Sequence, residues 1–350
     1  MNNNVNILLL SQDDIFRAGG MDFGNAIKVT EKAIREYING NVIFPSKVSQ
    51  VFDQETQDRI NCLPATLINE NVCGMKWVSV FPQYPKKYDL NNLNALLVLS
   101  STVNGAPLAF MEGSLCSNVR TACVNAVAAK YLAKSNPTSI GFVGAGEQAK
   151  SAFLAIKTVY PQISKCYISS RTTKTEDKFY QTFASIYKDV EFIKCNADYE
   201  KATRNADILV SAISGQTPLI KGEWISEGTL YLHTGGWEDD FSVAQKADKI
   251  YCDNWDSVKH RGSQTISKMF VAGLLKDSDI TGEIDRLLSG EIPSRENDKE
   301  FIYFNAVGLS YVDIAIANDV YLKCKEAGLG TEFNLKSCDM FKYLGQTGRF

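Results

Sequence analysis

The sequence predicts an α/β protein in which a doubly wound parallel sheet is combined with a second, discontinuous α+β domain. Two observations support this prediction. From residue 139 onward, short apolar segments alternate with segments of helical periodicity, and such alternation indicates βαβ units around a parallel sheet. Before residue 112, strand-like segments follow one another with mostly turn residues between them, which is typical of antiparallel pairing.

The first part of the chain is predicted to form one helix and several strands. Residues 5–10 are apolar and predict a strand, whereas residues 22–39 place apolar side chains on one helical face before Gly40. Asn104-Gly105 is a strong hairpin signal between the last two strands. The other strands are expected at residues 42–52, 59–67, 73–80, 95–103 and 107–111.

The second part of the chain begins with a long helix, expected at residues 118–134 with Ser117 as its N-cap and Pro137 beyond its end. A final helix is expected at residues 312–327, and we expect it to return to the first domain. The parallel strands are expected at residues 140–143, 166–170, 191–195, 208–212, 229–233 and 249–252.

A glycine-rich motif lies where the first parallel strand meets a helix. Residues 140–149 read Ile-Gly-Phe-Val-Gly-Ala-Gly-Glu-Gln-Ala. Gly144 would permit a tight turn, Gly146 would let backbone N–H groups approach a pyrophosphate, and Ala149 would let the helix pack closely. The alternative is a glycine-rich turn without a ligand. The strand and helix on either side favour a nicotinamide or flavin dinucleotide.

The end of the second parallel strand indicates which dinucleotide is preferred. NAD-binding folds commonly place an acidic residue there to bind the ribose hydroxyls. This chain instead has Ser170, Arg171 and Thr172. These side chains are better suited to a 2′-phosphate, so the sequence favours NADP over NAD.

Three cations are candidates for binding an anionic substrate. Lys76 interrupts an apolar strand, and a buried lysine needs an anionic partner unless it is an edge residue that faces water. Arg120 is expected in the first turn of the long helix, where a cation opposes the helix dipole unless an anion is bound nearby. Lys47 could supply a second positive contact, or could be solvated.

An acidic segment follows the strand that ends at His233. Residues 233–240 read His-Thr-Gly-Gly-Trp-Glu-Asp-Asp. Because loops after parallel strands open into the ligand crevice, Glu238 or Asp239 could act as a general base or bind an ammonium group. The alternative is a solvated acidic loop.

Composition excludes several other classes of function. The chain has 350 residues and a net charge of −3, which offers no electrostatic footprint for nucleic acid or an anionic membrane. None of the nine cysteines forms a C-x-x-C pair, so we expect reduced thiols in a cytoplasmic protein. The two histidines show no ligand spacing, and we expect no metal site.

Taken together, these residues resemble the ornithine cyclodeaminase/μ-crystallin family over about residues 6–335. Within the family, the chain is most similar to the branch that makes 2,3-diaminopropionate and contains N-(2-amino-2-carboxyethyl)-L-glutamate dehydrogenases. The motifs that carry the resemblance are Gly-Met-Lys76-Trp, Met-Glu112-Gly-Ser, Val-Arg120-Thr-Ala, Gly144-Ala145-Gly146-Glu-Gln148-Ala149 and Gly328-Leu-Gly330.

The resemblance implies a homodimer with a discontinuous substrate and dimerisation domain at residues 1–125 and 305–335. It implies a Rossmann dinucleotide-binding domain at residues 126–304 and a tail at residues 336–350. It further implies roles for individual residues. Those implied to bind the substrate carboxylate are Lys47, Lys76 and Arg120, and those implied to lie at the cofactor are Thr121, Gly144, Gly146 and Gln148.

The chain departs from the family pattern at two places. Where cyclodeaminases carry a catalytic aspartate, the nearest match is Glu238, which argues against cyclodeamination. Where the diaminopropionate branch has an aspartate, this chain has Ser170, and Ser170-Arg171-Thr172 is closer to the Asn-Arg-Thr of the μ-crystallin branch.

The sequence therefore predicts an NAD(P)-dependent oxidoreductase that acts on the Cα–N bond of an amino-acid-derived amine or imine. Glu238 or Asp239 would transfer protons, and Lys76 would act beside them in the catalytic site. Two alternatives remain: a cyclodeaminase that recycles bound NAD, and a non-enzymatic protein that binds a small ligand as μ-crystallin-like chains can.

Overall fold

The computed structural model describes residues 4–213 and 215–336, and the contacts within the chain divide it into two compact units. Unit 1 comprises the described residues of Met1–Gly20, Asn41–Cys116 and Asp313–Phe350, and unit 2 comprises those of Met21–Gly40 and Ser117–Val312. Apart from Lys336, the tail expected at residues 336–350 lies outside the described residues.

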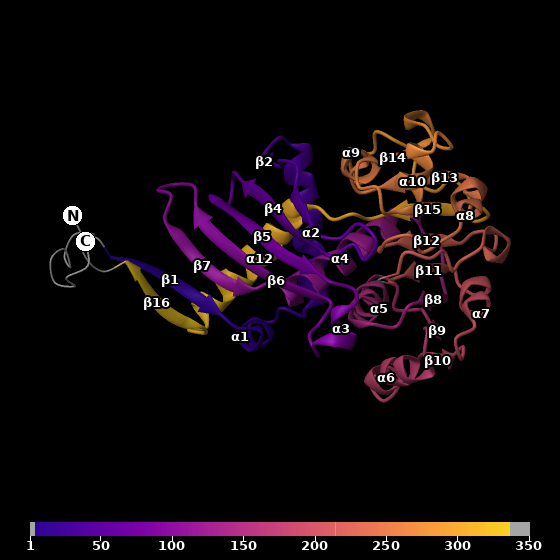
Figure 1. The fold of residues 1–350 in the computed structure, drawn as a ribbon, viewed down its shortest axis with the longest axis horizontal. Helices are drawn as coiled ribbons and strands as arrows, with labels where there is room; N and C mark the ends of the chain where they lie inside the picture. The colour runs from indigo at the N-terminus through magenta and orange to yellow at the C-terminus, as the bar shows by residue number, and fades with distance from the viewer. Residues whose placement is uncertain (1–3, 214, 337–350) are drawn as a thin grey trace. The chain divides into compact units, whose positions relative to one another are not determined.

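Unit 1 contains a mixed eight-stranded sheet in the order β16-β1-β7-β6-β5-β4-β2, with β3 also paired to β4 (Figure 1). Strand β1 is parallel to β7, and the other pairs are antiparallel. The strands are β1 (Val5–Leu10), β2 (Val42–Ile43), β3 (Val48–Val51), β4 (Arg59–Leu67), β5 (Val72–Val80), β6 (Leu93–Ser101), β7 (Pro107–Glu112) and β16 (Thr331–Lys336).

Two features of this sheet differ from the sequence prediction. The single strand expected at residues 42–52 is two strands, β2 and β3, because Pro45 between them has no N–H to donate to a ladder. Strand β16 was not predicted, and it pairs with β1 from the other end of the chain. The hairpin at Asn104-Gly105 is confirmed, since β6 and β7 are antiparallel neighbours and Gly105 has φ +73°.

One face of the unit 1 sheet is buried under helix α12 (Ser310–Glu326), most of which belongs to this unit. The other described helices of the unit are α1 (Gln12–Arg17) and α3 (Tyr84–Lys87). A Cβ at Gly74 in β5 would lie 3.0 Å from Cδ1 of Ile314, so α12 packs directly on this face. The directly paired residues Met111, Leu97 and Lys76 all point to it and are buried.

Unit 2 is built on an entirely parallel sheet of eight strands in the order β10-β9-β8-β11-β12-β15-β13-β14. The order reverses between β8 and β11, which creates a topological switch point. This doubly wound sheet confirms the predicted fold class. The strands are β8 (Ser139–Val143), β9 (Lys165–Ser169), β10 (Glu191–Lys194), β11 (Ile208–Ser211), β12 (Leu230–His233), β13 (Lys249–Cys252), β14 (Gly282–Glu283) and β15 (Ile302–Asn305).

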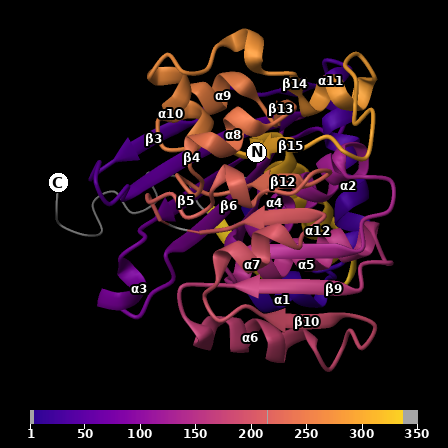
Figure 2. The ribbon, with the colours of Figure 1, turned by 90° about the vertical axis from the view of Figure 1, so that its right-hand side faces the viewer.

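Helices flank the parallel sheet, and Figure 2 shows α6 beside the edge strand β10. Helix α2 begins after its N-cap Asp22 and packs on α5 and α11. It therefore belongs to unit 2, although the sequence grouped residues 1–125 together. The helices are α2 (Phe23–Ile38), α5 (Glu147–Val159), α6 (Thr173–Phe183), α7 (Tyr199–Arg204), α8 (Phe241–Lys246), α9 (Trp255–Lys259), α10 (Thr265–Val271) and α11 (Ile284–Ser289).

Helix α4 (Ser114–Leu132) starts four residues earlier than the sequence predicted. Its first N–H groups, those of Ser114 and Leu115, donate to the side chain of Glu112 at 2.5 and 3.1 Å. This cap explains the early start, and it places Ser117 inside the helix rather than at its N-cap. Arg120 consequently lies in the second turn, so the expected opposition between its charge and the first turn of the helix is wrong.

The described cysteines are all free thiols, and most are buried. Among residues 4–213 and 215–336, no helix combines the length and the apolar character needed to cross a bilayer.

Candidate dinucleotide and catalytic site

The glycine-rich turn lies directly after β8, at the switch point of the parallel sheet. Gly144 has φ +99°, and its N–H donates to the carbonyl of Ser169 at 2.8 Å. A Cβ at Gly144 would lie only 2.4 Å from the carbonyl oxygen of Ala212, in the segment that leaves β11. Both the backbone angle and the close approach therefore require glycine here.

Gly146 leaves open space at the start of helix α5. It is the N-cap of this helix, and a Cβ added to it would meet no atom within 4 Å. Ala149 is fully buried, which allows the first turn to pack closely. Free N–H groups at the first turn of a helix form a site for phosphate. The turn therefore fits the pyrophosphate of a dinucleotide.

Of the other predicted cofactor residues, Gln148 connects this turn to helix α4, and Thr121 lies within that helix. The side-chain amide of Gln148 donates to the carbonyl of Asn118 at 3.5 Å. The Thr121 hydroxyl donates to the carbonyl of Ser117 at 2.8 Å. Ala145, between the two glycines, is buried. The structure thus brings the start of α5 and the second turn of α4 together within unit 2.

The residues after β9 carry no acid that is open to a ribose. The N–H of Ser170 donates to Glu176, a fully buried carboxylate that also accepts from the N–H groups of Asn196 and Ala197. The carboxylate of Glu176 thus binds backbone N–H groups of unit 2 and is not directed to a ribose. Arg171 and Thr172 are exposed, and the guanidinium remains accessible to a phosphate group.

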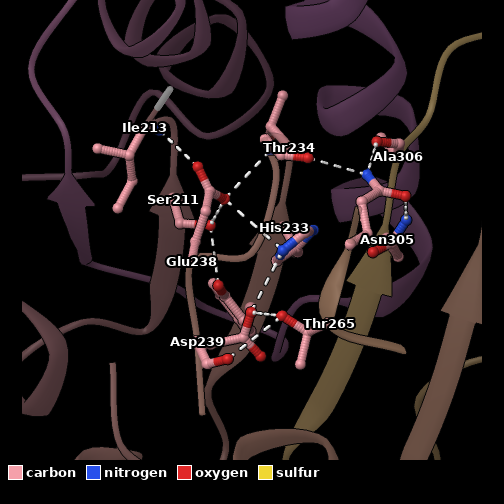
Figure 3. A network of polar contacts seen from close by, with 12 residues as sticks. Ser211, Ile213, His233, Thr234, Glu238, Asp239, Thr265, Asn305 and Ala306 are labelled. Carbon is pink, nitrogen blue, oxygen red and sulfur yellow. Dashed lines mark hydrogen bonds and ion pairs between the residues drawn. The ribbon is translucent and has the colours of Figure 1, made fainter. Parts of the chain in front are cut away.

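The acidic segment after β12 is mostly buried rather than solvated. Glu238 and Asp239 are completely inaccessible, whereas Asp240 is exposed and caps helix α8 by accepting from the N–H of Ser242. Figure 3 shows the side chains of Glu238 and Asp239 pointing toward His233. The solvated-loop alternative is therefore wrong for the first two carboxylates.

Glu238 is held between the ends of β11 and β12. Its carboxylate accepts hydrogen bonds from the Ser211 hydroxyl, from the N–H of Ile213 and from the N–H of Gly235. Burial raises the pKa of Glu238, although the nearby His233 and these donors oppose the shift.

Asp239 pairs with a buried histidine that the sequence analysis did not select. One carboxylate oxygen lies 3.2 Å from Nε2 of His233 and accepts from the Thr265 hydroxyl at 2.6 Å. Burial disfavours the imidazolium, but Asp239 and then Glu238 outweigh burial and raise the pKa of His233. His233 and Ser211 are the directly paired last residues of β12 and β11. Polar residues at adjacent strand ends are the signal that could have identified them.

Lys76 lies in unit 1 and is only 1% exposed. Its Nζ is 2.7 Å from a carboxylate oxygen of Asp313 on α12. Strand β5 lies between β4 and β6, so the edge-strand alternative is wrong. The anionic partner was missed because it lies 237 residues away in the sequence. Lys47, also in unit 1, is half-buried between β2 and β3.

Arg120 lies in unit 2 and is only 8% exposed. Its guanidinium packs against Gly308, where an added Cβ would lie 2.6 Å from Nη1. The three predicted carboxylate-binding cations are thus divided between unit 1 and unit 2.

The sequence profile of the ornithine cyclodeaminase/mu-crystallin family matches residues 7–328. The chain belongs to this family. It is 25% identical over 336 residues to the N-((2S)-2-amino-2-carboxyethyl)-L-glutamate dehydrogenase of Staphylococcus aureus, covering 95% of this chain and 99% of that relative. The family membership inferred from the motifs is therefore confirmed.

Solved structures of this family have the same fold. The Δ1-pyrroline-2-carboxylate reductase of Thermococcus litoralis, in complex with NADH and L-proline, has a TM-score of 0.87 at 29% identity and covers 93% of this chain and 99% of its own. An archaeal alanine dehydrogenase dimer with bound NAD has a TM-score of 0.86 at 29% identity and covers 95% of this chain and 100% of its own.

Proposed function

We propose that the protein is an NAD(P)-dependent oxidoreductase that acts on the Cα–N bond of an amino-acid-derived amine or imine. The observation that carries this proposal is the Gly144–Gly146 turn at the switch point of a parallel sheet, with backbone N–H groups and open space for a pyrophosphate. Relatives that match nearly the whole chain are named as amino-acid dehydrogenases or imine reductases. When bound, the nicotinamide would accept a hydride from Cα or donate one to it.

The chain's own residues would bind and orient the substrate. Lys47, Lys76 and Arg120 would hold its carboxylate, since burial makes both Lys76 and Arg120 strong partners for an anion. Asp313 would keep Lys76 charged and directed. Thr121 and Gln148 would line the cofactor beside the glycine turn.

Glu238 is our first choice for the group that transfers protons at the substrate nitrogen or at an attacking water. It lies between the ends of β11 and β12, where a doubly wound sheet exposes ligands to side chains. Burial raises its pKa above the ordinary value for a glutamate, which is the direction in which enzymes tune a carboxyl for proton transfer. Asp239, paired with His233, is the second choice.

We further propose a preference for NADP over NAD. Arg171 is exposed shortly after β9, and the buried carboxylate of Glu176 is engaged by three backbone N–H groups. An exposed guanidinium at this position favours a 2′-phosphate.

A homodimer is the proposed assembly, with the outer face of the unit 1 sheet as its interface. The archaeal relative is described as a dimer. The strand register places two adjacent apolar rows on the face opposite Lys76, which we call the outer face. One row consists of Leu9, Phe110, Val98, Met75 and Pro64, and the other of Leu96, Trp77 and Cys62. A monomer rarely exposes such a patch.

Turnover measurements with both cofactors test the proposed activity. The substrate set is pyruvate with ammonia, Δ1-pyrroline-2-carboxylate and N-(2-amino-2-carboxyethyl)-L-glutamate, the last representing the diaminopropionate branch. A net change in nicotinamide absorbance with any of them supports the proposal. L-Ornithine is tested beside this set, and its conversion to proline without a net change in nicotinamide absorbance would identify a cyclodeaminase. Binding of a candidate substrate without turnover would identify a non-enzymatic carrier.

A further inference from the structure

The turn between β15 and α12 is held by side chains from several elements of unit 2. This turn consists of residues 306–308. The side-chain amide of Gln264 donates to the carbonyl of Ala306, which is labelled in Figure 3, at 3.1 Å. The guanidinium of Arg261 donates to the carbonyl of Val307 at 3.3 Å. The backbone of the turn therefore has little freedom to move.

Asp253, directly after β13, holds the N–H groups of the same turn. One of its carboxylate oxygens accepts from the N–H of Val307 at 2.8 Å and of Gly308 at 2.6 Å, and the other accepts from Asn254 at 2.9 Å. Asp253 is 3% exposed. Its carboxylate is thus a rigid brace between the ends of β13 and β15.

The braced turn forms a seat for the guanidinium of Arg120. Gly308 has φ +113°, and a Cβ there would lie 2.6 Å from Nη1, 3.0 Å from Nη2 and 3.1 Å from Cζ of Arg120. The guanidinium therefore occupies the space that any other side chain at position 308 would fill. The charge of Arg120 also acts on Asp253 and opposes the rise in the pKa of that carboxyl caused by burial.

We propose that Asp253 and Gly308 are positioning residues for Arg120, and that they set the affinity of the site for the substrate carboxylate. This inference rests on the proposed role of Arg120 in binding that carboxylate. The carboxylate of Asp253 fixes the turn and offers Arg120 an opposite charge, while Gly308 provides the surface against which the guanidinium lies. A guanidinium held in one orientation binds a carboxylate through two parallel hydrogen bonds.

A double-mutant cycle tests the coupling. Gly308→Ala and Asp253→Asn are each made in the wild-type chain and in Arg120→Ala, with the active substrate of the turnover set as the probe. We expect each single variant to raise KM about tenfold with a smaller change in kcat and unchanged NADPH and NADH affinity. In the Arg120→Ala background, neither change should raise KM further. An equal rise in both backgrounds would overturn the proposal.

Two matched variants control for general strain. Gly290→Ala also introduces a side chain at positive φ, +78°, but a Cβ there meets no atom. Asp207→Asn also changes a carboxylate that accepts from backbone N–H groups, at Thr138 and Ser139. Neither residue belongs to the proposed site, and both variants should keep the wild-type KM.

A measurement without substrate separates failure of this inference from failure of the proposed function. The Nε–H signal of Arg120, assigned by its loss in Arg120→Lys, is followed by ¹H–¹⁵N NMR. It should move in Gly308→Ala and Asp253→Asn and stay in place in both controls. An unmoved signal would overturn the positioning role even in an active enzyme. A moved signal in a protein without turnover would support positioning and count against the activity.

Discussion

The two buried carboxylates after β12 differ in the donors around them. Glu238 receives two backbone N–H groups and a serine hydroxyl, so its position depends on the ends of β11 and β12. Asp239 receives the Thr265 hydroxyl and lies beside the imidazole of His233, so its position depends on α10 and β12. The two carboxylates therefore have separate structural supports, and the proposed proton transfer can be tested at each of them independently.

Substitution of each carboxylate by its amide distinguishes the two roles. We expect Glu238→Gln to lower kcat about 10²–10⁴-fold without weakening dinucleotide binding, because the amide keeps the shape but cannot accept the proton. Asp239→Asn is the paired variant. A large loss in Asp239→Asn with a mild effect of Glu238→Gln would assign the proton transfer to Asp239. Mild effects in both would contradict a catalytic role for either.

The exposed Arg171 leads to a prediction about the cofactor. A charge-assisted contact between a guanidinium and the 2′-phosphate contributes ~1.5–3 kcal/mol. NADPH should therefore bind about tenfold more tightly than NADH, and Arg171→Ala should remove most of this difference. Calorimetric titration measures both affinities. Lys174, exposed in the first turn of α6 shortly after Arg171, provides the control, since Lys174→Ala should keep the preference. Equal binding of the two cofactors to the wild type would refute the prediction.

At the scale of elements, local patterns were sufficient where a segment's environment depends on its own residues. The strand expected at residues 59–67 is β4 as the structure has it, and the glycine turn follows β8 as expected. Strand β16 is exposed along its whole length, so no burial pattern marks it, and it exists through pairing with β1. The early start of α4 depends on the side chain of Glu112. Asp313, the partner of Lys76, was missed because proximity in the fold leaves no trace in a local pattern. His233 was missed although it is a polar residue at a strand end beside another.

The ion pair between Lys76 and Asp313 joins β5 to α12 inside unit 1. Asp313→Asn leaves a buried charge without its counter-ion and should lower the free energy of unfolding by about 3–5 kcal/mol, whereas Lys76→Met with Asp313→Leu should restore much of the loss. Urea unfolding measures the free energy of unfolding of both variants, provided that the m-value is the same as in the wild type. Asp319→Asn, which removes a partly exposed pair with Lys323 on the same helix, should cost less than about 1 kcal/mol. A double variant as unstable as Asp313→Asn would contradict this account.

At the scale of the whole molecule, the buried histidine should make stability depend on pH. The pKa of His233 is raised above its ordinary 6.5 in the folded state. The folded protein therefore binds this proton more tightly than the unfolded chain does. The resulting stabilisation is fully present below pH 6.5 and is lost as the pH rises through the folded pKa.

His233→Asn removes this contribution while retaining a polar side chain. Between pH 6 and 9, the wild type should lose stability more steeply than the variant, by up to about 1.4 kcal/mol per pH unit for one proton. Urea unfolding at several pH values gives both slopes. The exposed His260 supplies the control, because His260→Asn should keep the wild-type slope. Parallel slopes for the wild type and His233→Asn would show that His233 does not bind the extra proton.

The outer face of the unit 1 sheet should determine the assembly. Phe110 and Leu96 are 41% and 40% exposed near the centre of this face, and a second copy would remove both from water. Phe110→Lys would place an unpaired charge in that interface. We therefore expect the wild type to sediment as a dimer and Phe110→Lys to shift toward monomer. The dissociation constant of the dimer should rise about 100-fold or more.

Val103→Lys is the control, because Val103 is 74% exposed at the β6–β7 hairpin. Dinucleotide affinity should survive in both variants, since the glycine turn belongs to unit 2. A dimer that persists in Phe110→Lys would assign the interface to another surface, and a monomeric wild type would contradict the proposed assembly itself.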